Sequence, residues 1–143
     1  MTVSAAQSIE VAEKVDHPNV GILYDQANLA FTLQEDYQDA INLQMKKILY
    51  THVKDLVFKT GDISFVSDEV SHPKEEDRNV YTRIVGEGCL PWQDILQMMH
   101  DKGYEGWLSL EYERRWHPDD IPDASIGMKK SADYLKECFK KIV

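Results

Sequence analysis

The sequence contains few cysteines, and their placement excludes a fold built on disulfide bonds. Cys89 and Cys138 are the only two among 143 residues, and neither belongs to a CxxC pair. Two isolated thiols provide no disulfide framework, so reduced cysteines in a cytosolic protein are the simplest interpretation.

Long apolar runs and an excess of basic residues are also missing. No stretch approaches the roughly 20 apolar residues of a membrane helix, and the N-terminus shows no signal-type apolar region. The formal net charge of −9 gives a surface that repels phosphate backbones. We therefore expect a cytoplasmic protein that binds neither membranes nor nucleic acids.

The apolar pattern predicts alternating helices and strands in a chain of one domain's length. Helical spacing covers residues 4–15, 35–47, 91–100 and 126–142, and a loop runs through Asn28 to the second of these helices. A nearly continuous apolar run predicts a strand at 20–24. A second strand is predicted at 48–55, with apolar residues first and polar residues last, and a third from 107 onward. This order predicts an α/β fold with a parallel sheet, although three strands cannot close a barrel.

Residues 56–88 are the least helical part of the chain. Two β-prone pieces, 63–66 and 80–85, flank a charged turn at 72–78. We interpret this part as an excursion on the carboxyl side of the sheet, in the form of an irregular hairpin. The charged turn is expected to be a solvated surface.

The stretch 103–113 predicts a turn followed by a strand that ends on carboxylates. Alternate strand residues face opposite sides, so Leu108 and Leu110 share one face and Glu111 and Glu113 the other. An apolar outer face with acids at the carboxyl end is typical of a (β/α) barrel strand. The alternative is a sheet strand whose acids are merely solvated.

Each of the three predicted strands ends in a residue that can bind metal: Asp25, His52 and Glu111. The carboxyl ends of parallel strands lie on the same edge of a sheet, so these side chains are expected to meet. One imidazole and two carboxylates suit Mn²⁺, Mg²⁺ or Co²⁺ and are also acceptable to Zn²⁺. From spacing alone, a metal site and a coincidence of polar strand ends both remain open.

Six short segments carry a resemblance to a known family. They are HPNVG (17–21), DQANL (25–29), THVKD (51–55), GEG (86–88), GWLSLE (106–111) and YERRWHP (112–118). In order and spacing they resemble the C-terminal part of the sugar phosphate isomerase/epimerase family, which has the xylose-isomerase-like TIM barrel and is related to endonuclease IV. The resemblance implies a partial (β/α)8 TIM barrel, about strands 6–8, with residues 1–143 as a single domain.

The resemblance also implies a divalent metal and a reaction. In that family a glutamate after strand five, an aspartate after strand six, a histidine after strand seven and a glutamate after strand eight hold the metal. The last three correspond to Asp25, His52 and Glu111. The metal, Mn²⁺ in the first instance, polarises substrate oxygens and stabilises an enediolate. The two glutamates act as acid and base, and Glu111 is one of them.

Two departures from the family pattern qualify this expectation. Asn28 stands where many relatives have a histidine, and an amide is a poorer metal ligand although it can bind a sugar hydroxyl. The strand-five glutamate and strands one to five have no counterpart, since the glutamate would lie upstream of Ser4. We expect a C-terminal fragment of a barrel of about 250 residues. Its open sheet predicts a homo-oligomer or a complementing N-terminal half.

Further substrate-binding candidates are Asn28, Lys54, Arg83 and Trp116. Lys54 follows His52 by two positions and is a candidate for binding a phosphate or hydroxyl group, with a solvated lysine as the alternative. Arg83 precedes the GEG turn and is a candidate for reaching the substrate. Trp116 is expected either to form a pocket wall against a sugar ring or to fill the edge of the core.

These features favour a metal-dependent sugar or sugar-phosphate isomerase or epimerase that transfers a proton next to a carbonyl. An inosose-type dehydratase is an alternative, because the same enolisation precedes loss of water. A non-catalytic barrel remnant or interaction module is another, because the upstream glutamate is missing. An apurinic endonuclease ranks lower, since the acidic sequence offers neither a histidine-rich multi-zinc site nor a basic face.

Overall fold

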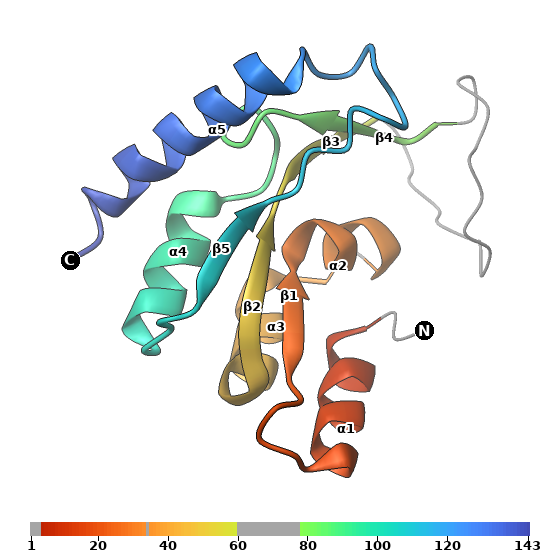
Figure 1. Cartoon of the computed structure of the whole chain (residues 1–143). Helices are drawn as coiled ribbons and strands as arrows, with labels where there is room; N and C mark the ends of the chain where they lie inside the picture. Colours follow the sequence, from red (N-terminus) through yellow and green to blue (C-terminus); the bar gives the residue numbers. More distant parts are fainter. Residues whose placement is uncertain (1–3, 34, 60–77) are drawn as a thin grey trace.

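The computed structural model describes residues 4–33, 35–59 and 78–143 (Figure 1). The predicted α/β fold with a parallel sheet is confirmed. The elements in chain order are α1 (Ala5–Val15), β1 (Ile22–Asp25), α2 (Gln26–Leu33), α3 (Tyr37–Gln44), the 3-10 turn η1 (Met45–Lys47), β2 (Ile48–Val53), β3 (Asp55–Phe58), β4 (Val80–Arg83), α4 (Trp92–Asp101), β5 (Trp107–Leu110) and α5 (Ala124–Phe139).

The three predicted strands form a parallel sheet in the order β1-β2-β5. The register places Asp25 beside His52 and His52 beside Ser109. Beyond β5, the Glu111 N–H donates to the Val53 carbonyl over 3.0 Å. The carboxyl ends of all three strands therefore lie at one edge, as the sequence predicts.

Helices cover one face of this sheet. A core cluster joins α1, α3 and α4 to the inward-facing residues of the strands, with Ile41, Trp92 and Ile95 fully buried at its centre. Leu108 and Leu110 pack against the same cluster, which confirms the predicted apolar face of β5. The alternate residues of each strand point to the second face of the sheet.

The second face carries an exposed apolar row. Leu23, Tyr50 and Trp107 occupy one register row across β1, β2 and β5. Their exposures are 50%, 40% and 76%. Side chains of this size are rarely left in a contiguous exposed row.

The predicted loop through Asn28 is wrong, because α2 begins directly after β1. The Asp25 carboxylate accepts the backbone N–H of Asn28 over 2.9 Å, which satisfies a free donor of the first helical turn. A helix of eight residues carries little apolar periodicity, and this explains why the pattern of apolar residues misses it. The following helix, α3, begins at Tyr37 with Asp36 as its N-cap.

The predicted strand 48–55 is interrupted at Lys54. Asp55 instead opens β3, which pairs antiparallel with β4, so that Asp55 lies opposite Arg83. A hairpin therefore exists, but its first strand is β3; residues 63–66 lie outside the described residues, and so does the charged turn except for Arg78. Arg78 is buried, with 3% exposure, so the solvated-surface expectation does not hold there.

The four predicted helices begin and end within three residues of their predicted bounds. Ser4 caps α1, and Gly103 follows α4 with a φ of 78°, a conformation that favours glycine. Pro91 is the N-cap of α4 instead of its first residue. Both cysteines are unpaired. In the described ranges, no helix has the length and apolarity needed to cross a membrane.

Candidate functional site

Asp25 ends β1 as a buried carboxylate with 7% exposure. Asn28 holds both of its oxygens: the backbone N–H donates to Oδ1 and the side-chain Nδ2 to Oδ2, each over 2.9 Å. Asn28, predicted to bind substrate, therefore orients the Asp25 carboxylate. This contact exists because α2 begins at Gln26, directly after the strand, and places Asn28 in its first turn.

His52 and Glu111 converge on Asp25 at the carboxyl edge of the sheet. His52 Nδ1 lies 3.3 Å from Glu111 Oε2 and 3.8 Å from Asp25 Oδ2. One potential ligand atom from each of the three residues lies within 4.8 Å of the others. Three side chains separated by up to 86 positions thus form one compact group.

Lys54 lies in the middle of the acidic groups. Its Nζ is 2.7 Å from Glu111 Oε2, 3.1 Å from Glu113 Oε1 and 3.3 Å from Asp25 Oδ2. The side chain is only 10% exposed, which excludes the solvated-lysine alternative. Because Lys54 follows His52 by two positions, the sequence correctly predicts that both side chains lie on the same side of the strand. It does not predict the contact between Lys54 and the carboxylates.

The charged residues of the site shift one another's pKa values, and burial shifts them as well. Burial raises the pKa of Asp25, although the Lys54 charge and the Asn28 N–H oppose that rise. Burial also works against ionisation of Glu111, but Lys54 and His52 lower its pKa overall. Burial disfavours the charged form of Lys54, yet its three carboxylate neighbours raise its pKa. At neutral pH, Lys54 is a cation and Glu111 a carboxylate.

Arg83 and Trp116 lie in different surroundings. Arg83 is half-buried on β4 and lines a small pocket together with Lys54, Glu111 and Glu113. Its Nη1 donates to the Thr82 carbonyl over 2.7 Å. Trp116 is 52% exposed in the loop after β5, with the Arg115 guanidinium 5.1 Å from its ring centre. Arg83 thus belongs to the site region, and Trp116 does not line this pocket.

Sequence reasoning assigned no role to Asp55, which organises the turn beside the site. Its buried carboxylate accepts backbone N–H groups from four residues: Leu56, Gly86, Gly88 and Leu90. A Cβ on Gly88 would lie 2.0 Å from Asp55 Oδ1, so glycine is required there. The signal in the sequence that could have indicated a role for Asp55 is its position three residues after the predicted ligand His52 and next to Lys54.

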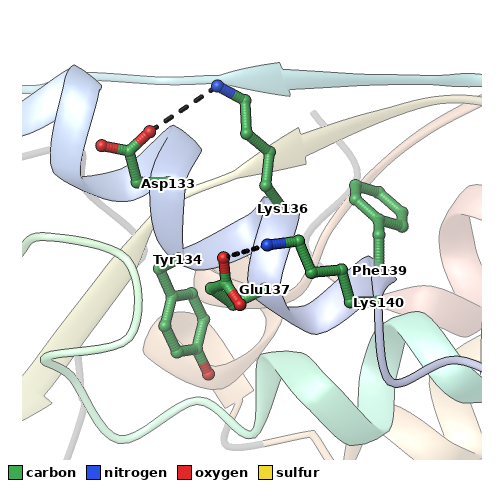
Figure 2. Close-up of a pocket in the computed structure, with 6 residues that line it drawn as sticks. All are labelled: Asp133, Tyr134, Lys136, Glu137, Phe139 and Lys140. Carbon is green, nitrogen blue, oxygen red and sulfur yellow. Dashed lines mark hydrogen bonds and ion pairs between the residues drawn. The ribbon is translucent and has the colours of Figure 1, made fainter.

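A second hollow lies elsewhere, on the outer surface of α5. Figure 2 shows its six lining residues, with ion pairs from Lys136 to Asp133 over 3.6 Å and from Lys140 to Glu137 over 2.6 Å. Five of the six residues belong to α5 and Lys140 directly follows it, and the paired charges are largely exposed. This hollow is an open helix surface without a group of converging ligands.

The Asp25, His52 and Glu111 donors fit a divalent metal. A neutral imidazole and two carboxylates match the oxygen- and nitrogen-rich sets that Mn²⁺, Co²⁺ or Zn²⁺ accept. In the part of the chain that the structure describes, they form the one group of three or more such side chains close enough to share an ion. The fold and site therefore define an α/β protein with a candidate metal centre at the carboxyl edge of a parallel sheet.

The chain belongs to the xylose isomerase-like TIM barrel family, whose sequence profile matches residues 1–138. Its fold is similar to that of a xylose isomerase domain protein from Planctomyces limnophilus, with a TM-score of 0.67 and 21% identity. That similarity covers 96% of this chain and 42% of the other. The resemblance inferred from the sequence is thereby confirmed at the level of family.

Two curated relatives are distantly similar. The chain is 25% identical to the inosose dehydratase of Clostridium botulinum (strain Eklund 17B / Type B) over 94% of its own length and 44% of that protein. It is 26% identical to the rhizopine catabolism protein MocC of Rhizobium meliloti over 74% of its length and 34% of that protein. The chain thus spans less than half the length of either relative.

Proposed function

We propose that this chain forms the metal-binding C-terminal part of a sugar or sugar-phosphate isomerase or epimerase, which transfers a proton next to a carbonyl. Residues 1–143 would form one domain that corresponds to about strands 6–8 of the barrel. Asp25, His52 and Glu111 would hold Mn²⁺, with Mg²⁺, Co²⁺ or Zn²⁺ as alternatives. The observation that carries this proposal is the convergence of these three side chains within 4.8 Å.

The residues of the chain divide the chemistry between them. Glu111, whose lowered pKa keeps it ionised, accepts the proton next to the substrate carbonyl. Lys54 offers an ammonium to an anionic or hydroxyl oxygen, Asn28 keeps Asp25 oriented, and Arg83 faces the adjoining pocket. When bound, the divalent metal supplies Lewis-acid polarisation of the substrate oxygens. Trp116, which does not line this pocket, has no assigned role in this proposal.

An inosose-type dehydratase is the second candidate. It is favoured by the similarity to inosose dehydratase, which covers 94% of this chain. Both reactions begin by removing a proton next to a carbonyl, so the same Glu111 serves either one. The products separate them, because a dehydratase product is lighter by one water whereas an isomerase product has the mass of its substrate.

Partner strands are part of the proposal. The exposed row Leu23, Tyr50 and Trp107 lies on the sheet face that the helices leave uncovered. We propose that a second copy of the chain, or a polypeptide with the remaining barrel strands, covers this row in the cytoplasm. Light scattering on the purified chain tests the first arrangement, and a compact monomer at high dilution contradicts it.

The deciding experiment is Mn²⁺ titration of the purified chain beside Asp25→Asn and Glu111→Gln. One-to-one binding that is lost in both variants supports the metal site, and binding that neither variant changes refutes it. Exchange of the substrate α-proton with D₂O, followed by NMR, then tests the chemistry. Manganese-stimulated exchange that survives Glu111→Gln removes Glu111 as the base. A folded chain that exchanges no ketose favours a non-catalytic remnant.

A further inference from the structure

Lys54 contacts the same two carboxylate oxygens that lie nearest to His52 Nδ1. Its Nζ contacts Glu111 Oε2 over 2.7 Å and Asp25 Oδ2 over 3.3 Å. These two atoms are also the ones that lie 3.3 and 3.8 Å from His52 Nδ1. A cation held by these two oxygens and His52 Nδ1 would therefore lie where the ammonium lies.

Two cations cannot both occupy this position at low cost. Metal–oxygen bonds of about 2.0–2.2 Å would bring a divalent ion within a few ångströms of Nζ. The Lys54 side chain is 10% exposed and that of Asp25 is 8% exposed, so water screens the repulsion poorly. In a metal-free chain the ammonium is instead favourable, because it balances carboxylates that are costly to bury unpaired.

Glu113 gives Lys54 a partner outside the group of ligands. Its Oε1 lies 3.1 Å from Nζ, and Glu113 is not one of the three residues that can share an ion. It lines the small pocket that also includes Thr82 and Arg83. Lys54 can thus leave Asp25 while it keeps one ion pair.

We propose that Lys54 is a built-in competitor of the metal: its ammonium neutralises the metal-free site and must move off Asp25 and Glu111, toward Glu113, before a divalent cation binds. This inference rests on the proposed function, because it uses the same metal site. It adds that metal affinity is set by a lysine that is itself not a ligand.

The test measures Mn²⁺ affinity by calorimetry on the whole purified chain. Lys54→Met should bind at least about tenfold more tightly than the unmodified chain, because a positive charge next to the ion is removed. Lys14→Met is the matched control: it makes the same change on α1, where Lys14 is 73% exposed and paired with Glu10. Its Mn²⁺ affinity should stay within about twofold of the unmodified chain.

Thermal melting provides a second readout. In chelator, Lys54→Met should melt below the unmodified chain, because its carboxylates lose their counter-charge. Added Mn²⁺ should raise its melting temperature more than it raises that of the unmodified chain. Lys54→Gln replaces Lys54→Met in both measurements if the methionine variant does not fold.

Glu113→Gln tests the proposed destination of Lys54. Without that partner the ammonium should stay on Asp25 and Glu111, so Mn²⁺ affinity should fall several-fold. The effect should disappear in the Lys54→Met background, where no ammonium competes. An equal loss in both backgrounds contradicts the proposed movement.

Several outcomes overturn the inference, and they separate it from the proposed function. If Lys54→Met binds Mn²⁺ no more tightly than the unmodified chain while Asp25→Asn abolishes binding, the metal site stands and only the competition fails. If Asp25→Asn and Glu111→Gln bind as the unmodified chain does, the site itself is wrong. If neither the unmodified chain nor Lys54→Met binds Mn²⁺, both proposals fail.

Discussion

Replacement of Asp55 by asparagine should destabilise the chain more than any exposed charge change. The Asp55 carboxylate, with 1% exposure, accepts four backbone N–H groups: those of Leu56 and Leu90 on Oδ1 and those of Gly86 and Gly88 on Oδ2. Both oxygens therefore have their acceptor positions in use. The carboxylate joins the start of β3 to the turn that leads into α4.

The size of the effect follows from these contacts. Asparagine keeps one oxygen but places an NH₂ group against two of the four N–H donors. An unpaired buried donor costs about 1–3 kcal/mol, so the loss of two partners should lower the free energy of unfolding by about 2–6 kcal/mol. That is a large share of the roughly 5–15 kcal/mol that stabilises a domain, and the melting temperature should drop by roughly 6–18 °C.

Urea titration followed by tryptophan fluorescence measures this loss. Trp92 is a suitable probe, because it is fully buried and its Nε1 donates to the Lys54 carbonyl over 3.1 Å. Asp119→Asn, at an exposed position, is the control and should change the unfolding free energy by less than about 0.5 kcal/mol. An Asp55→Asn loss as small as that of the control would refute the assigned role.

Three further predictions concern other parts of the chain. Burial opposes ionisation of Asp120, but the buried Arg78 lowers the pKa of Asp120 overall. This ion pair therefore stabilises the fold above about pH 4, and that stabilisation is lost as the pH falls further. Asp120→Asn should cost about 3 kcal/mol at pH 7 in urea titration and should flatten the acid dependence. Gly103→Ala should cost about 1 kcal/mol through its positive φ alone, since a Cβ there has no atom within 4 Å; an unchanged urea midpoint would contradict this. Trp107→Ser should leave the stability of the monomer nearly unchanged and weaken self-association in light scattering.

The sequence by itself determined the parallel α/β arrangement and the residues at its carboxyl edge. Apolar runs that end in Asp25, His52 and Glu111 are local signals, since strand geometry and side-chain alternation act within a few residues. The cap at Ser4 and the stop at Gly103 are equally local. Such features need no knowledge of what a segment packs against.

Only the tertiary structure decided how the polar side chains pair. The Lys54 to Glu111 contact joins positions 57 apart, and the Asp55 to Gly86 contact joins positions 31 apart. Such pairings depend on which segments the fold brings together and on how much water it removes, because burial makes an unpaired charge costly. From the sequence alone, Lys54 could equally have been a solvated lysine at the end of a strand. Burial among three carboxylates makes it the central cation of the site.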